Sequence, residues 1–213
     1  MLARIAIITL AFAIPALAQF TGPQQTNIHD SSPLKPPPGV RVAIFEFIDL
    51  ECPDCANAAP VVKEASEKYH IPLLRHDFPL PQHAWSFDAA VDARWFDTKS
   101  TKLGDDFRDT VFANQRKIAS TDDLRTFAEA FAKQYGLQLP FAVDPSGTLA
   151  AKVKADYALG QRVGIEHTPT IWVVTNQTKG TPFVEVVDRG KLDQLIEDAE
   201  NQTAGEKKVA AKR

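Results

Sequence analysis

The chain contains two cysteines, Cys52 and Cys55, separated only by Pro53 and Asp54. Thiols at this spacing can exchange disulfides, because one thiolate attacks a disulfide sulfur and the second thiol then resolves the mixed disulfide. The pair follows an apolar run and opens a segment with helical character, so Cys52 is expected at a helix N-terminus. There, unpaired backbone N–H groups and the helix dipole favour a thiolate. We therefore assign Cys52 as the nucleophile and Cys55 as the less exposed resolving thiol.

Other uses of a cysteine pair fit less well. A haem attachment site needs histidine directly after the second cysteine, where this chain has Ala56. A disulfide across four residues would remove little loop entropy and so stabilise the fold little. A carrier of Cu(I), which prefers thiolate ligands, is the alternative from another functional class. Zinc would need two of the five histidines, none of which are paired at ligand spacing: His29, His70, His76, His83 and His167.

Glu46 is a candidate for moving the proton of the resolving thiol. It precedes Cys52 by six residues and shares one face of the expected strand with Ile44 and Ile48, by the period of two. A buried carboxylate there has a raised pKa and can take and return the proton of Cys55. The competing interpretation is an exposed glutamate on an edge strand.

Thr168 and Pro169 are candidates for binding the substrate, since they stand directly before another expected strand. If the peptide bond between them is cis, the adjacent backbone groups are free to hydrogen-bond an extended chain.

Hydrophobic patterns predict the elements that position these residues. In the middle of the chain the period becomes helical, with Phe87, Val91 and Trp95 recurring at spacing four and expected to pack inward. The last helix carries Leu192, Leu195, Ile196 and Ala199 on one face. Strands are expected over 41–49, 71–78, 170–175 and 183–187, with helices over 52–69 and through a block at about 83–164.

The N-terminal segment of the chain suggests export. Residues 1–18 combine one positive charge, a short apolar run and small residues before Ala18, which is typical of a cleaved signal peptide and places the mature protein in the periplasm or outside the cell. A retained N-terminal anchor is the alternative. Residues 19–40 form a Pro-rich leader, 41–200 the main domain and 201–213 a basic tail. A net charge of -3 argues against nucleic acid as a partner.

Four stretches together resemble the DsbA-like family of thioredoxin-fold disulfide oxidoreductases. The resemblance covers about residues 41 to 200, and the combination is more specific than the cysteine spacing alone. The stretches are 45–55 (FEFIDLECPDC), 78–83 (FPLPQH), 111–115 (VFANQ) and 164–170 (GIEHTPT).

This resemblance implies an α/β thioredoxin fold with an inserted helical domain. It also implies that Glu46 is the buried acidic residue, that Pro60 kinks the first helix and that Pro169 is the cis proline. Family members introduce, reduce or reshuffle disulfides in exported proteins. The implied partners are therefore exported proteins with cysteines and a membrane-bound or soluble redox partner, with no cofactor beyond the Cys52–Cys55 pair.

The dipeptide between the cysteines departs from the family pattern. The strongest oxidants of the family carry Pro-His where this chain has Pro53 and Asp54. The carboxylate of Asp54 should repel a Cys52 thiolate, which favours a reductase or isomerase as the alternative to an oxidase. His167 precedes Thr168 where glycine is common; it either compensates as a cation near Cys52 or is a plain surface residue.

Overall fold

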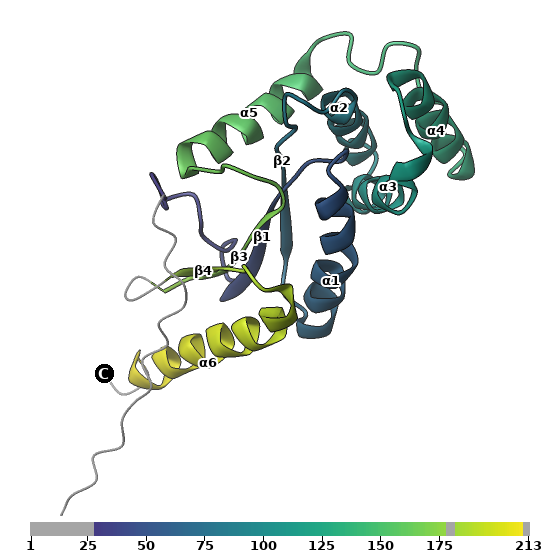
Figure 1. The fold of residues 1–213 in the computed structure, drawn as a ribbon. Helices are drawn as coiled ribbons and strands as arrows, with labels where there is room; N and C mark the ends of the chain where they lie inside the picture. Colours follow the sequence, from purple (N-terminus) through teal and green to yellow (C-terminus); the bar gives the residue numbers. More distant parts are fainter. Residues whose placement is uncertain (1–27, 178–181, 211–213) are drawn as a thin grey trace, which may run out of the picture.

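The computed structural model describes residues 28–177 and 182–210 (Figure 1). The predicted signal peptide, residues 1–18, lies outside these ranges. Within them, none of the helices has the length and apolar character that crossing a membrane requires. The chain forms a mixed α/β fold with helices on both faces of one sheet, so the predicted fold class is confirmed.

A four-stranded sheet in the order β2-β1-β3-β4 forms the centre of the fold. β1 (Val42–Ile48) pairs in parallel with β2 (Leu73–Asp77) and antiparallel with β3 (Thr170–Thr175). β4 (Phe183–Glu185) continues the antiparallel pairing at the far edge. All seven side chains of β1 are buried, as expected for a central strand covered on both faces.

Helices cover the two faces of the sheet differently. α1 (Pro53–Tyr69) and α6 (Leu192–Ala210) pack on one face, where Val62 and Ile196 meet Ile44. α5 (Thr148–Val163) covers the other face, where Val163 packs with Phe47. The alternation of side chains along β1 therefore points Glu46, like Ile44, toward α1.

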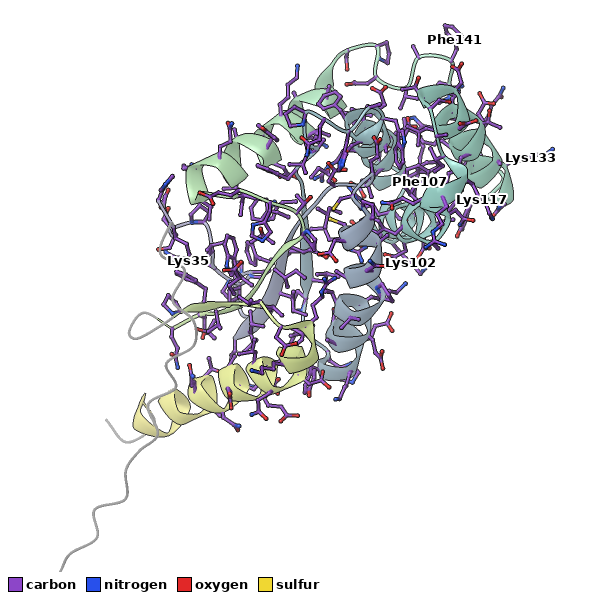
Figure 2. The ribbon with its side chains drawn as sticks, viewed as in Figure 1. Lys35, Lys102, Phe107, Lys117, Lys133 and Phe141 are labelled. Atoms are coloured by element: carbon purple, nitrogen blue, oxygen red, sulfur yellow. The ribbon has the colours of Figure 1, made fainter. Side chains whose placement is uncertain are left out.

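The connection between β2 and β3 consists of helices gathered at one end of the molecule (Figure 1). These are α2 (Ser86–Asp97), α3 (Thr101–Asn114), the short turn η1 (Gln115–Lys117) and α4 (Thr121–Gln134), followed by α5. Phe107 lies inside this block (Figure 2) and shares one buried cluster with Cys52 and Cys55. The inserted helices therefore form the wall behind the cysteine pair.

The expected inward face of α2 is confirmed only at Trp95, which packs against the buried cluster that contains both cysteines. Phe87, Val91 and Trp95 are only partly buried, because α2 packs closely on α3 and α5 through small side chains on a neighbouring face. The buried residues of α2 are Ser86, Ala89, Ala90, Asp92, Ala93 and Phe96.

The described part of the Pro-rich leader is attached to the fold. Leu34 is only 2% exposed and joins the cluster around Phe47 and Trp172. The backbone N–H of His29 donates to the carbonyl oxygen of Val163 at 3.0 Å.

Candidate functional site

Both cysteines lie where β1 gives way to α1. Cys52 is the N-cap residue of α1 and has an extended backbone, and the exposed Pro53 begins the first turn. Both thiols are free, with Cys52 7% exposed and Cys55 fully buried. Gln115 fixes this connection from η1, because its side-chain amide donates to the carbonyl oxygens of Leu50 at 2.8 Å and Cys52 at 2.9 Å.

The surroundings of Cys52 favour its thiolate. A hydrogen bond from the Cys55 thiol lowers the pKa of Cys52 to about 5 against the opposing effect of burial, helped by the Thr168 side chain and by the backbone N–H groups of Cys55 and Asp54. When protonated, Cys52 donates to the carbonyl oxygen of Thr168, 3.4 Å from its Sγ. The thiol nearest the surface is therefore the ionised one at neutral pH.

Cys55 has the opposite character. Burial raises its pKa strongly, and the hydrogen bond that its thiol donates to Cys52 raises it further. The backbone N–H of Asp49 points at the Cys55 sulfur from 3.5 Å. The negative charge of Glu46 also raises the pKa of Cys55, so the two groups lie close enough to interact electrostatically.

Glu46 is fully buried, so it is not an exposed edge-strand residue. Burial raises the pKa of Glu46 to about 7, although the positive charge of Arg75 opposes this. The strand register places Arg75 directly beside Glu46, with Nε 3.4 Å from Oε2. Neither carboxylate oxygen has a hydrogen-bond partner among the described residues. A carboxyl group that titrates near neutral pH beside a buried thiol is suited to proton transfer.

Arg75 is a site residue that the sequence did not point out. Its side chain is 5% exposed, and its guanidinium Nη1 also lies 2.8 Å from Asp109 of α3. Asp109 in turn binds the partly exposed Lys63 at 2.7 Å. These charges link the buried Glu46 to the protein surface.

The residues expected to adjust the redox properties differ in their surroundings. Asp54 is bound by Arg189 from the turn η2 (Arg189–Lys191), with 2.6 Å between Oδ1 and Nη2. Its carboxylate therefore does not act on Cys52 as an unpaired charge. His167 is 64% exposed at its side chain and lies 4.0 Å from Glu185. The charge of His167 is not among the main causes of the lowered pKa of Cys52.

The Thr168–Pro169 peptide bond is cis, as predicted. Thr168 is 8% exposed, and a hydrogen bond from its side chain helps to lower the pKa of Cys52. The loop touches Cys52 through the contact at the Thr168 carbonyl. Thr168 and the cysteine pair, 116 positions apart, are thus brought together as expected.

No group of three or more histidine, cysteine or acidic side chains in the described ranges is arranged to hold a metal ion. His83 and His76 pair instead with Asp49 at 2.7 Å and Asp156 at 3.1 Å, respectively.

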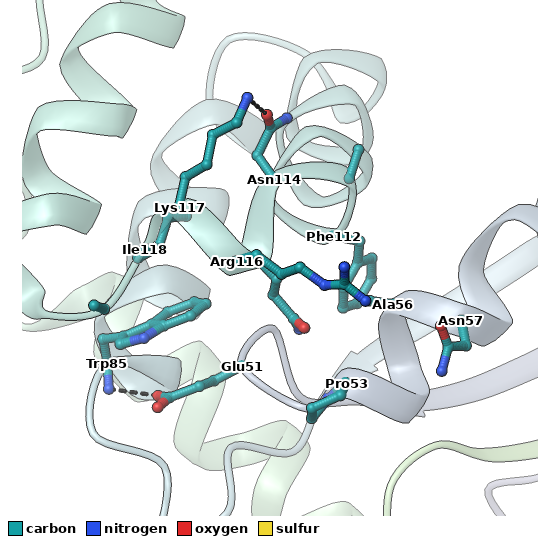
Figure 3. Close-up of a pocket in the computed structure, with 13 residues that line it drawn as sticks. Glu51, Pro53, Ala56, Asn57, Trp85, Phe112, Asn114, Arg116, Lys117 and Ile118 are labelled. Atoms are coloured by element: carbon teal, nitrogen blue, oxygen red, sulfur yellow. Dashed lines mark hydrogen bonds between the residues drawn. The ribbon is translucent and has the colours of Figure 1, made fainter.

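A pocket of about 680 Å³ opens beside Pro53 (Figure 3). One wall is the start of α1, with Ala56 and Asn57; the opposite wall is the connection from α3 to α4, with Arg116. Trp85, Phe112 and Ile118 contribute the buried, apolar part of the lining. No pattern along the chain predicted this pocket, because its walls come from segments that only the tertiary fold brings together.

The fold and the sequence both have counterparts among known proteins. A family model described as thioredoxin matches residues 38–201. The solved structure of Wolbachia pipientis alpha-DsbA1 is similar at 17% identity, with a TM-score of 0.61, covering 78% of this chain and 92% of that one. No curated protein sequence matches the chain.

Two further solved structures show the same fold. The oxidoreductase NmDsbA1 from Neisseria meningitidis is 19% identical, with a TM-score of 0.57 and coverage of 81% of this chain and 90% of that one. Pseudomonas aeruginosa DsbA2 is 20% identical, with a TM-score of 0.55 and coverage of 82% and 94%. The resemblance that the sequence indicated is confirmed: the chain belongs to the thioredoxin family and has the DsbA-like form of the thioredoxin fold, with its helical insertion.

Proposed function

We propose that the protein is an exported thiol-disulfide oxidoreductase that exchanges disulfides with cysteines of other proteins through Cys52-Pro53-Asp54-Cys55. The main support for this proposal is the difference in pKa between the two thiols: the pKa of Cys52 is lowered to about 5 and that of Cys55 is raised. An ionised sulfur is a good nucleophile and a good leaving group, and a fully buried protonated one is suited to resolving the mixed disulfide.

In the oxidising direction, a substrate thiolate attacks Sγ of Cys52 in the Cys52–Cys55 disulfide. The bond between the two protein sulfurs breaks, and Cys55 leaves with the electron pair and receives a proton from Glu46. A second substrate thiolate then attacks the substrate sulfur of the mixed disulfide and releases Cys52 as a thiolate. The substrate loses two electrons and the protein gains them; the reverse sequence reduces a substrate disulfide.

The loop at Thr168 and Pro169 is the proposed contact for the substrate backbone, because it lies directly against Cys52. Polar backbone groups beside a reactive sulfur can pair with an extended chain as a strand would. No cofactor beyond the cysteine pair takes part in this scheme. Export rests on the signal-peptide pattern of residues 1–18.

Exchange with a reduced, unfolded protein that carries two cysteines tests the proposal. The oxidised protein should transfer its disulfide, so that one substrate disulfide appears for each Cys52–Cys55 pair reduced, and Cys52→Ser should abolish the transfer. Tight Cu(I) binding by the reduced protein, with no exchange, would support the metallochaperone instead.

Trapping of the thiols by acid and alkylation in intact cells then shows whether the protein oxidises or reduces its substrates. A cysteine pair that is mostly oxidised indicates an oxidase that a redox partner keeps oxidised. A pair that is mostly reduced indicates a reductase or isomerase.

A further inference from the structure

The pocket beside Pro53 borders the redox-active turn, because Pro53 directly follows Cys52. Its lining includes Pro53, Ala56 and Asn57 from the start of α1, but no residue of the Thr168–Pro169 loop. The pocket therefore begins one residue from the reacting sulfur, within reach of the residues that flank a substrate cysteine bound at Cys52. A volume of about 680 Å³ lies within the range of protein sites that enclose small ligands or side chains.

Positive charge in this pocket is not neutralised. The guanidinium group of Arg116 has no hydrogen bond or ion pair to any residue that the structure describes. Figure 3 shows its side chain extending across the pocket toward Phe112 and α1. Lys117 donates at 2.8 Å to the side-chain oxygen of Asn114, an uncharged partner. Both cations therefore stay available to a ligand carboxylate.

Glu51, the acidic residue in the pocket lining, already accepts hydrogen bonds from the protein backbone. The carboxylate of Glu51 accepts backbone N–H groups from Trp85 at 2.7 Å and Ser86 at 3.1 Å, at the start of α2. A helix N-terminus stabilises such a carboxylate, so Glu51 has less tendency to pair with Arg116 or to attract a cationic ligand.

The position of Arg116 is tied to the reactive loop. Its neighbour Gln115 donates to the carbonyl oxygens of Leu50 and Cys52. The backbone that carries the cation is thus held against the backbone that carries the nucleophile. Charged groups fixed beside a reacting sulfur can select among substrates by charge.

We propose that this pocket binds the part of the substrate polypeptide that flanks its reacting cysteine, and that it selects an acidic side chain there through Arg116. This inference rests on the proposed function and names the substrate class of the same site. The aspartate or glutamate of the substrate pairs with the guanidinium, while the buried face formed by Trp85 and Phe112 excludes water from one side of the pair.

Short peptides with a single cysteine test this selection. In the Cys55→Ser protein, Cys52 is first converted to a mixed disulfide with 2-thiopyridine, which carries no charge at neutral pH. A peptide thiolate then attacks Cys52, breaks that disulfide, forms the peptide–Cys52 disulfide and releases pyridine-2-thione, whose appearance gives the rate. The peptides carry Glu, Gln or Lys at each of three positions on either side of the cysteine.

Each rate is divided by the rate of the same peptide with free 2,2′-dithiodipyridine, which removes differences in intrinsic thiol reactivity. At one or more positions the Glu peptide should react about 3- to 10-fold faster than the Gln peptide, and the Lys peptide more slowly than both. The preference should shrink in high salt, which screens the ion pair.

Variants of this Cys55→Ser protein identify the cation responsible. Arg116→Gln should bring the ratio of Glu to Gln peptide rates close to one, and Arg116→Glu should reverse it. The control Lys133→Gln, which removes an exposed cation on the outer side of α4 (Figure 2), should keep the full preference.

Equal normalised rates for all peptides, or a preference that survives Arg116→Glu, would overturn the inference while leaving the proposed function intact. Release of thione by no peptide at all would contradict the proposed function, and this inference with it. A preference for the Lys peptide would show that Glu51 governs the pocket, and would also overturn the inference.

Discussion

Arg189 binds Asp54, the residue that separates the two cysteines on the N-terminal turn of α1. Its Nη2 lies 2.6 Å from Oδ1 of Asp54, and its Nη1 donates to the Asp54 carbonyl oxygen at 3.2 Å. The pair joins the segment before α6 to the redox-active turn. The repulsion of Cys52 by Asp54 that the sequence suggested is therefore opposed by a cation close by, although solvent exposure of both side chains weakens the pair.

Removing this cation should make the protein less oxidising. In Arg189→Gln the uncompensated Asp54 charge should raise the pKa of Cys52 by about 0.3 to 1 unit and lower the redox potential by about 10 to 30 mV. Thiolate absorbance and equilibration against glutathione measure the two quantities.

Two further variants test whether the effect of Arg189→Gln comes from its ion pair with Asp54. Lys191→Gln removes a neighbouring cation on the same turn and should change neither quantity. If the double variant Asp54→Asn, Arg189→Gln shows the same shift as Arg189→Gln alone, the effect does not pass through Asp54.

Glu46 should make the stability of the reduced protein depend on pH. Its folded pKa is raised from 4.5 to about 7, so the folded state binds more protons than the unfolded state between these values, and stability falls as pH rises through this window. Glu46→Gln should remove this loss and stabilise the protein by up to about 3 kcal/mol at pH 8, with little gain below pH 4.5. Urea unfolding at several pH values measures it.

Asp92 provides the matched control for Glu46. Burial also raises its pKa to about 7, but it lies on α2 and is not among the main causes of the raised pKa of Cys55. Asp92→Asn should stabilise the protein in the same direction and leave disulfide exchange unchanged, whereas Glu46→Gln should slow exchange. Exchange rates of Glu46→Gln equal to the parent's from pH 6 to 8 would mean that Glu46 is only structural.

Arg75 should contribute most to the stability of the fold when Glu46 is ionised. Arg75→Gln leaves the buried carboxylate without its cation and should cost about 2 to 4 kcal/mol at pH 8, and less at pH 5, where Glu46 is protonated. Adding Glu46→Gln to the Arg75→Gln variant should restore much of the lost stability. Lys63→Gln, on the exposed side of Asp109, should cost less than about 1 kcal/mol. A loss that is equal at both pH values would exclude Glu46 as its cause.

The two cysteines should differ in alkylation. With limiting iodoacetamide at pH 6, the reduced protein should be labelled at Cys52 well before Cys55, because the pKa of Cys52 is about 5 and that of Cys55 is raised. Mass spectrometry of the digested protein gives the ratio. Equal labelling would contradict the assignment of nucleophile and resolving thiol.

Local pattern was enough to predict the centre of the site. The apolar run of β1, the cysteine at a helix start and the period of two that turns Glu46 toward α1 all depend on neighbouring residues. The order of elements followed from the same patterns. β2 and β4 are shorter than expected, at Leu73–Asp77 and Phe183–Glu185, and strand ends are the least certain part of such predictions.

The charged partners of the site could not be found in this way. Arg75 meets Glu46 only through the parallel register of β1 and β2, which neither strand reveals alone. Arg189 and Arg116 reach the cysteine turn from the segment before α6 and from the helical insertion. A pattern that counts large apolar residues also missed most of the buried face of α2, where alanines allow close packing.

Trapping of a mixed disulfide shows whether Cys52 exchanges disulfides with other proteins. Reduced Cys55→Ser protein is mixed with a protein that contains a disulfide, quenched with acid, and analysed on a non-reducing gel and by peptide mapping. We expect a covalent adduct through Cys52 that reductant removes, because no resolving thiol remains, and no adduct in Cys52→Ser. An adduct through Cys55 in Cys52→Ser, or no adduct in either variant, would contradict this expectation.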